Sequence, residues 1–183
     1  MSLRDAIKLK HDAAEAHPLT AVMFSGQMSP AMYYTMLANQ LVVYAQLETR
    51  AEEMGLLDDL PGLARSNKIV DDLNELARTF DIGVLENLPC SSKHADHVAS
   101  LDAKGVLAHM YVIHMGDMYG GQMLKSKLPG SCTRYDFENR SALVAALRQK
   151  LTDDLADEAN TAFDFTLEFF DALADKYHLR AAR

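Results

Sequence analysis

The sequence contains no tryptophan and only two cysteines, Cys90 and Cys132, among its 183 residues. Two cysteines allow one disulfide at most, and their spacing fits neither a metal site nor a redox pair, so a reducing cytoplasm is the expected compartment. The chain also lacks an excess of positive charge, because its formal net charge is -8. General nucleic-acid and anionic-membrane surfaces need an excess of lysine and arginine, so neither partner is expected.

Long hydrophobic runs are also absent. No stretch approaches the roughly 18 apolar residues that a membrane span requires, and the N-terminus begins with a charged helical pattern instead of an apolar signal core. The chain ends at Arg183 without a hydrophobic tail, so we expect a soluble protein. There is no dinucleotide or flavin motif, and the absence of any Glu-x-x-His pair argues against a carboxylate-bridged di-iron bundle.

What is present is helical periodicity. With 49% hydrophobic residues and no strand signal, residues 1–183 predict an all-α fold, a single compact helical domain with a sizeable core. Helices are expected from Ser2 to before Pro18, from Pro30 to about Met54 and around 69–80, with a connection at 82–89. Further helices are expected from Ser91 or Ser92, over 105–128, over 141–155 and around 163–177.

The stretch 105–128 is an apolar helical pattern that contains Gly116, Gly120 and Gly121. Each internal glycine costs roughly 1 kcal/mol relative to alanine, so the segment needs a compensating reason to keep them. Gly116 and Gly120 share one helix face and leave a strip of bare backbone that a flat ligand can approach, with Asp117 beside it. A close helix crossing, or a helix ending at Gly120 with Asp117 solvated, explains these residues equally well.

His11 follows Leu3 and Ile7 at helical spacing, which places it on the apolar stripe of the first helix. A histidine on such a stripe is more often a hydrogen-bonded core residue than a ligand. Glu15 lies one turn further and is positioned to orient the imidazole. His94 and His97 form an i, i+3 pair without carboxylate partners at a matching spacing, so a surface pair is favoured over a metal site.

Two motifs together resemble those of the heme oxygenases. The segment 116–124, Gly-Asp-Met-Tyr-Gly-Gly-Gln-Met-Leu, resembles the Gly-Asp-x-x-Gly-Gly-Gln-x-Leu pattern of the family's distal helix, with Ala108-His109-x-Tyr111 upstream at the family's spacing. Residues 3–15 resemble the proximal helix that supplies the heme ligand, and 161–170 resemble the last helix. The resemblance implies heme held between the proximal helix and a glycine-kinked distal helix.

The resemblance also implies an activity and a set of site residues. A heme oxygenase uses O2 and electrons from an external donor to open heme to biliverdin, carbon monoxide and ferrous iron, so heme is both cofactor and substrate. His11 would bind the iron, and Asp117 would steer a proton through ordered water. The remaining residues expected to contact or support heme are Glu15, Arg4, Tyr111, Gly116, Gly120, Arg148, Phe163 and Phe170, with Arg4 and Arg148 at the propionates.

Two positions depart from the family pattern. Ile113 stands where many members have a distal arginine, and Val144 stands where a second propionate lysine is often found. His114 is a candidate replacement for a polar group of the distal network. The missing arginine supports the alternative of a non-catalytic heme carrier or sensor, whereas Asp117 supports an enzyme.

The absence of a reductase motif implies an electron-donating partner, for which a reduced ferredoxin or flavodoxin is the expected class. A bilin reductase is a further candidate partner. The basic residues expected to form a docking rim are Arg4, Lys8, Lys125, Lys127, Arg148 and Lys150. A thiaminase-like hydrolase would need a nucleophilic core cysteine, but Cys90 and Cys132 are expected in loops. An interaction-only helical module would leave the glycines and Asp117 unexplained.

Overall fold

The computed structural model describes residues 1–83 and 87–179, and within these residues the chain is helical, without strands. The predicted all-α fold is confirmed, while residues 84–86 of the predicted connection at 82–89 lie outside the described residues. The α-helices are α1 (Leu3–Glu15), α2 (Pro18–Ser25), α3 (Pro30–Glu53), α4 (Ser66–Phe80), α5 (Pro89–Ser100), α6 (Ala103–Leu124), α7 (Arg140–Lys150) and α8 (Ala156–Lys176). Two 3-10 helices, η1 (Thr133–Tyr135) and η2 (Asp153–Leu155), connect the later elements.

Helix boundaries follow local chemistry. Ser2, Ser29 and Asp102 each accept a backbone N–H with the side chain at the start of α1, α3 and α6, which satisfies donors that have no partner inside the helix. After α3 the chain turns at Gly55, whose φ of 67° is a left-handed conformation that glycine adopts without strain. The predicted starts at Ser2 and Ser29 and the stop at Gly55 are confirmed.

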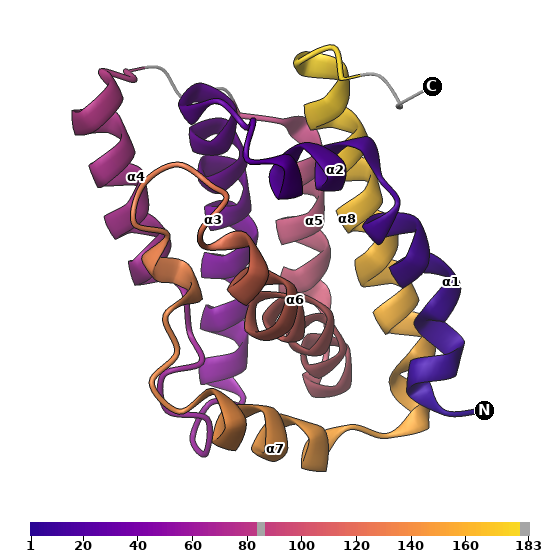
Figure 1. Cartoon of the computed structure of the whole chain (residues 1–183). Helices are drawn as coiled ribbons and strands as arrows, with labels where there is room; N and C mark the ends of the chain where they lie inside the picture. The colour runs from indigo at the N-terminus through magenta and orange to yellow at the C-terminus, as the bar shows by residue number, and fades with distance from the viewer. Residues whose placement is uncertain (84–86, 180–183) are drawn as a thin grey trace.

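Helix α8 organises the packing. Both α1 and α6 pack against α8, and α3 packs against α4 and α5, so α6 lies among the other helices while α7 runs along one end of the molecule (Figure 1). One buried cluster joins α3 to α4 around Leu37 and Leu76, and a second joins α6 to α7 and α8 around Met110 and Phe163. This packing fixes α6 on both sides of its glycines.

Several boundaries differ from the sequence prediction, among them the end of α6 at Leu124 and the start of α8 at Ala156. Helix α2 was not expected, and it forms because His17 accepts the N–H of Leu19 and Pro18 occupies the first helical position. Helix α5 begins at Pro89 rather than at Ser91 or Ser92, again because proline is favoured at the first position of a helix. Helix α7 ends at Lys150, so Leu155 belongs to η2 instead of the predicted 141–155 helix, although its side chain is still buried.

Within the described residues, none of the helices combines the length and the apolar character needed to span a lipid bilayer.

Candidate functional site

The backbone of α6 stays α-helical through Gly116, Gly120 and Gly121, as predicted. A Cβ added at Gly116 or Gly120 would meet no atom of the described residues within 4 Å, so this strip of backbone faces open space. Tyr119 and Met123, on the same side of the helix, are 48% and 65% exposed. The expectation of an accessible backbone strip therefore holds, and the alternative of a close helix crossing at Gly116 and Gly120 does not.

Gly121 has a different role. A Cβ at this position would lie 2.2 Å from Cδ1 of Tyr135, which is closer than any real contact allows. The ring of Tyr135 is buried against the bare backbone of α6, and Gln122 donates a hydrogen bond to the Tyr135 carbonyl at 2.7 Å. The third glycine is therefore a packing residue that brings η1 onto α6.

Asp117 is buried, with 6% of its surface exposed, and the reading of a solvated Asp117 is wrong. One carboxylate oxygen accepts a hydrogen bond from the Tyr44 hydroxyl at 2.7 Å. The other accepts from the guanidinium of Arg134 at 3.0 Å, and Arg134 also donates to the Tyr44 hydroxyl at 2.5 Å. Burial lowers the pKa of Arg134, but the combined effect of Asp117 and of the neighbouring tyrosines Tyr44, Tyr135 and Tyr33 outweighs burial and raises the pKa well above its usual value. Tyr44 and Arg134 thus hold both oxygens of Asp117.

The turn that carries Arg134 is fixed by Asp72 of α4. Asp72 accepts hydrogen bonds from the backbone N–H groups of Thr133 and Arg134, at 2.7 and 3.0 Å, and from the Thr133 hydroxyl. Cys132 begins the turn in a left-handed conformation with φ of 50°. Gln40 accepts a further hydrogen bond from Arg134 at 2.6 Å. The guanidinium is therefore directed into the core by its own backbone as well as by its partners.

His114 lies beside this network without joining it directly. Its ring meets the edge of Tyr44, with centroids 5.8 Å apart, and its Nδ1 lies 3.3 Å from the Met110 carbonyl. The Nε2 atom is buried 3.6 Å from a carboxylate oxygen of Glu48, beyond hydrogen-bond distance. The contact between His114 and the network of Asp117, Tyr44 and Arg134 is therefore the ring contact with Tyr44.

His11 is not on a buried stripe, because its side chain is 51% exposed. Leu3 and Ile7 are buried in the core. Residues four positions apart are not exactly aligned along a helix, so His11 is rotated away from the buried face. Its ring contacts the ring of Phe163 edge-on, with 6.0 Å between centroids. Glu15 Oε1 lies 3.8 Å from His11 Nε2, and Asp12 Oδ1 lies 3.8 Å from Nδ1. Within the described residues neither ring nitrogen is in a hydrogen bond, so both are available to a ligand.

Comparison with known proteins identifies the family of this chain. A family model described as heme oxygenase matches residues 1–144. The chain belongs to the heme oxygenase family. It is 24% identical to a heme oxygenase of the red alga Porphyra purpurea, covering 93% of this chain and 84% of that one. It is 27% identical to rat heme oxygenase 2, covering 93% and 64% of the two chains.

Solved structures share the fold. The heme complex of heme oxygenase-1 from the cyanobacterium Synechocystis has a TM-score of 0.81 with 22% identity, covering 95% of this chain and 91% of that chain. The heme oxygenase from Leptospira interrogans has a TM-score of 0.77 with 21% identity, covering 93% and 98%. The predicted heme oxygenase-like architecture is confirmed.

The residues of this family member fit a heme. The open space over Gly116 and Gly120 suits a flat macrocycle, since a side chain there would occupy it. The two unengaged nitrogens of His11 suit an iron ligand, because only a neutral imidazole nitrogen with a free lone pair can bind iron.

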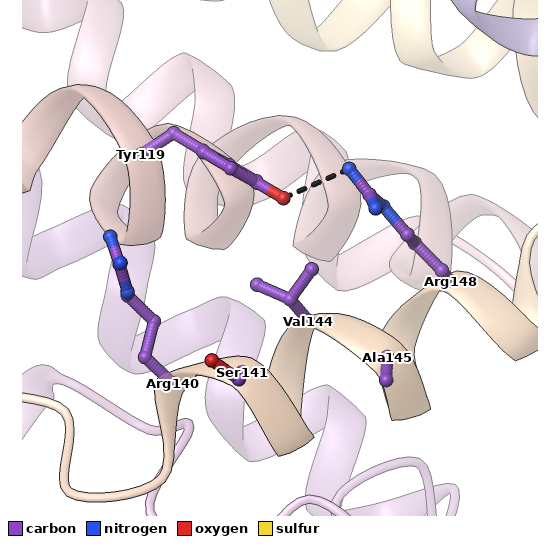
Figure 2. Close-up of a pocket in the computed structure, with 6 residues that line it drawn as sticks. All are labelled: Tyr119, Arg140, Ser141, Val144, Ala145 and Arg148. Atoms are coloured by element: carbon purple, nitrogen blue, oxygen red, sulfur yellow. Dashed lines mark hydrogen bonds between the residues drawn. The ribbon is translucent and has the colours of Figure 1, made fainter.

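A small pocket of about 220 Å³ lies between α6 and α7, beside the glycine strip. Tyr119 and Arg148 meet across it through a hydrogen bond of 2.9 Å, and Val144 forms part of its wall (Figure 2). Arg140 also lines the pocket and donates to the Met118 carbonyl at 3.0 Å. The position of the family lysine is thus apolar, and Arg140, one turn earlier on α7, is a second cation there.

Other predicted contact residues are placed around this region. Burial raises the pKa of Tyr111 on α6, while the charges of Arg148 and Arg4 act to lower it, so Tyr111 lies within electrostatic range of both arginines. Phe163 of α8 is buried in the core under His11. Phe170 lies further along α8, where its ring contacts His17 at 5.4 Å between centroids. Arg4 and Arg148 therefore act on Tyr111 through their charge, whereas Phe170 lies beside the start of α2.

Sequence reasoning missed Tyr44, Arg134 and Arg140. Tyr44 lies within the helix expected from Pro30 and carries no motif of its own, and Arg134 falls between the helices expected over 105–128 and 141–155, where an arginine is normally solvated. A signal for Arg134 was present in its neighbours, since Tyr135 and Phe137 are large side chains in a segment otherwise rich in turn residues. Arg140 was hidden because the helix was expected to begin at Ser141.

The two cysteines differ from each other in placement. Cys90 lies in the first turn of α5, so its prediction as a loop residue is wrong, whereas Cys132 lies in the loop before η1 as predicted; both are buried. Burial raises the pKa of both thiols, which suppresses the thiolate that a nucleophile needs. This environment gives no support to a cysteine-dependent hydrolase.

Proposed function

We propose that this heme oxygenase binds heme between α1 and α6, with His11 as the iron ligand and the backbone at Gly116 and Gly120 covering the opposite face. The observation that carries the proposal is the buried Asp117, fixed by Tyr44 and Arg134 next to a strip of backbone with open space over it. Bound heme supplies the iron that activates O2 and the porphyrin ring that is opened to biliverdin, carbon monoxide and ferrous iron.

Asp117 acts as the residue that moves protons. Both of its oxygens have a donor on the core side, and the carboxylate still has lone pairs for an ordered water on the glycine side, because each carboxylate oxygen accepts more than one hydrogen bond. Such a water can relay a proton to the reacting oxygen from a fixed position. Burial keeps this acceptor preorganised, so no side chain needs to reorient during the reaction.

Arg134 acts as a positioning residue for Asp117. Its guanidinium neutralises the buried carboxylate and fixes Tyr44 through a second hydrogen bond. The chain has Ile113 at the position of the family arginine, and Arg134 supplies an arginine to the aspartate from η1 instead. The missing arginine was the main argument for a heme carrier, and this placement removes that argument.

The cations near the pocket between α6 and α7 suit the propionates. Arg148 and Arg140 line it from α7, and Arg4 of α1 is close enough to Tyr111 for its charge to act on the Tyr111 hydroxyl. Arginine favours carboxylates because its planar group donates two parallel hydrogen bonds. Arg140 takes over the charge that a lysine at position 144 would provide.

The test is single-turnover and steady-state heme degradation. Purified protein is loaded with hemin and supplied with reduced ferredoxin and oxygen, while loss of the heme absorption band and the pigment formed are followed. Wild type is expected to give biliverdin, and Asp117→Asn is expected to bind heme normally but lose at least about tenfold in biliverdin yield. Normal biliverdin production by Asp117→Asn would reject the role of Asp117, and an intact, oxygen-binding heme in the wild type would favour a carrier.

The electron donor is proposed to be an acidic ferredoxin or flavodoxin. Of the predicted basic rim, Lys8, Lys125 and Lys150 are paired with Asp12, Asp136 and Asp59, so they contribute little net field. Arg4 and Arg148 are exposed and lie near the propionate pocket, which makes them the better docking residues. Turnover with ferredoxin is expected to fall as salt rises, because screening weakens steering between opposite charges. A bilin reductase is the class of enzyme proposed to consume the product.

A further inference from the structure

Three helices bring two histidines and a glutamate together, at the end of α6 that is distant in sequence from the glycines. His97 of α5 and His109 of α6 both direct Nε2 at the same oxygen of Glu158 on α8, at 2.6 and 2.9 Å. The ligand atoms of the three residues all lie within 4.8 Å of one another. The sequence pointed to His94 and His97 as a surface pair without a carboxylate partner, but the carboxylate comes from another helix and the pairing is with His109.

The cluster is closed on one side and open on the other. The side chain of His109 is completely buried, whereas those of His97 and Glu158 are 31% and 28% exposed. Phe165 covers the group from α8, with its ring 5.1 Å from His97 between centroids. A solvated ion could therefore reach the carboxylate and His97 from outside and complete its coordination at the buried His109.

His94 supplies the support that a histidine ligand requires. Its Nε2 lies 3.0 Å from Nδ1 of His109, and its ring stacks on Phe165 at 4.5 Å with 3° between planes. In the metal-free protein the hydrogen bond to Glu158 places the proton of His109 on Nε2. When an ion binds, His109 would carry its proton on Nδ1 instead, donate it to Nε2 of His94 and turn the Nε2 lone pair to the ion, which is the arrangement that orients metal-bound histidines.

The donor set selects a class of ion. Two imidazoles and one carboxylate suit zinc and ferrous iron, and three protein ligands leave at least one position for water. Tetrahedral ligands roughly 2.1 Å from a zinc ion are about 3.4 Å apart, so the present contacts of 2.6 and 2.9 Å need to open by less than about 1 Å.

We infer that His97, His109 and Glu158 form a binding site for a divalent transition-metal ion, with His94 orienting His109. The ion would fasten α5, α6 and α8 to one another at the end of α6 opposite the glycines. The site is separate from His11, which together with its neighbours Asp12 and Glu15 forms a second, exposed group of possible ligands. Because the inference concerns heme-free protein, it stands or falls independently of the heme reaction.

The experiment is titration of tag-free, heme-free protein with Zn²⁺ by calorimetry, and with Co²⁺ by visible absorption, which reports the coordination geometry. One equivalent of Zn²⁺ is expected to bind and to raise the thermal unfolding midpoint. His97→Gln and Glu158→Gln are expected to weaken the affinity at least tenfold, since each removes one ligand from a partly exposed side chain. His11→Gln is the matched control for the exposed group and is expected to bind as wild type does.

The titration results can overturn the proposed metal site in two ways. Absence of Zn²⁺ binding to the wild type at micromolar concentration would overturn the inference. Binding that is lost in His11→Gln and kept in His97→Gln would place the ion at the exposed group instead, which also overturns it. If Glu158→Gln fails to fold, His97→Gln and the Co²⁺ spectrum of the wild type still decide, because nitrogen coordination at low coordination number gives intense visible bands that hydrated Co²⁺ lacks.

Discussion

The guanidinium of Arg134 lies 3.0 Å from the carboxylate of Asp117, and both side chains are buried. The two residues come from different elements, η1 and α6, and the hydroxyl of Tyr44 bonds to both. A buried ion pair of this kind is sensitive to loss of one partner, because the other charge then remains in a poorly solvated place. Much of the behaviour of the site can be tested through this pair.

Arg134→Met is expected to destabilise the protein by about 3 kcal/mol, because Asp117 loses its compensating charge. The double variant Arg134→Met with Asp117→Asn is expected to recover part of that loss, since no unpaired charge is left. Urea unfolding of the wild type, both single variants and the double variant gives the coupling free energy. Strictly additive effects would mean that the pair is not coupled.

The glycines of α6 provide a matched set of variants. Gly116→Ala is expected to stabilise the heme-free protein by about 0.5 to 1 kcal/mol, because the methyl group enters open space and alanine favours the helix. Gly121→Ala is expected to destabilise it by about 1 to 3 kcal/mol, because its methyl group collides with Tyr135. Thermal unfolding measures both. Heme titration of Gly116→Ala should show weaker binding, and equal affinity would show that heme does not approach this backbone.

His11→Ala is expected to leave the stability of the heme-free protein within about 0.5 kcal/mol of wild type, because the ring is half exposed and makes only an edge contact with Phe163. The heme complex should lose its nitrogen ligand, and added imidazole should restore the wild-type absorption spectrum. His17→Ala is the control on α2, where stability should fall because His17 caps that helix, while the heme spectrum stays unchanged. An unchanged spectrum in His11→Ala would assign the ligand elsewhere.

Glu48 gives a prediction about pH. Burial raises the pKa of its carboxyl, but His114 and hydrogen bonds from Arg65 and Ser66 outweigh burial and lower it below the ordinary value of 4.5. A group with a lowered folded-state pKa contributes stability above the unfolded-state value, and that contribution is lost as the pH falls through the folded-state value.

Wild type should therefore lose more stability than Glu48→Gln between about pH 5 and about pH 3, as measured by urea unfolding. Glu53→Gln serves as the control, because Glu53 is half exposed in a surface pair with Arg50. Its acid sensitivity should match that of the wild type. Parallel losses in Glu48→Gln and wild type would show that Glu48 does not hold its charge through these contacts.

Much of the helical pattern was predictable from local chemistry, but packing decided the rest. The starts at Ser2 and Ser29 and the stop at Gly55 depend on neighbouring residues alone, and they were placed correctly. The prediction that His11 lies on the buried face of α1 was wrong, because residues four positions apart rotate gradually around a straight helix. Only the packing of α1 against α8 shows where the buried face ends.

Long-range partners explain the other misses at the site. The glycine strip and Asp117 lie within one short motif, and the sequence therefore pointed to them together. The partners of Asp117 are 73 and 17 residues away, on α3 and η1, and no spacing rule connects them. His94 and His97 were read as a surface pair for the same reason, since Glu158 is 61 residues from His97.

The contact between Gly121 and Tyr135 also affects the position of Arg134. Because α6 has no side chain at this position, the aromatic ring next to Arg134 can settle against the helix, and the guanidinium then arrives at Asp117. The third glycine of the motif therefore sets the charge balance of a carboxylate that it does not touch. Position 113 carries isoleucine, and the arginine that reaches Asp117 in this chain comes from η1, a segment that lies outside the glycine motif.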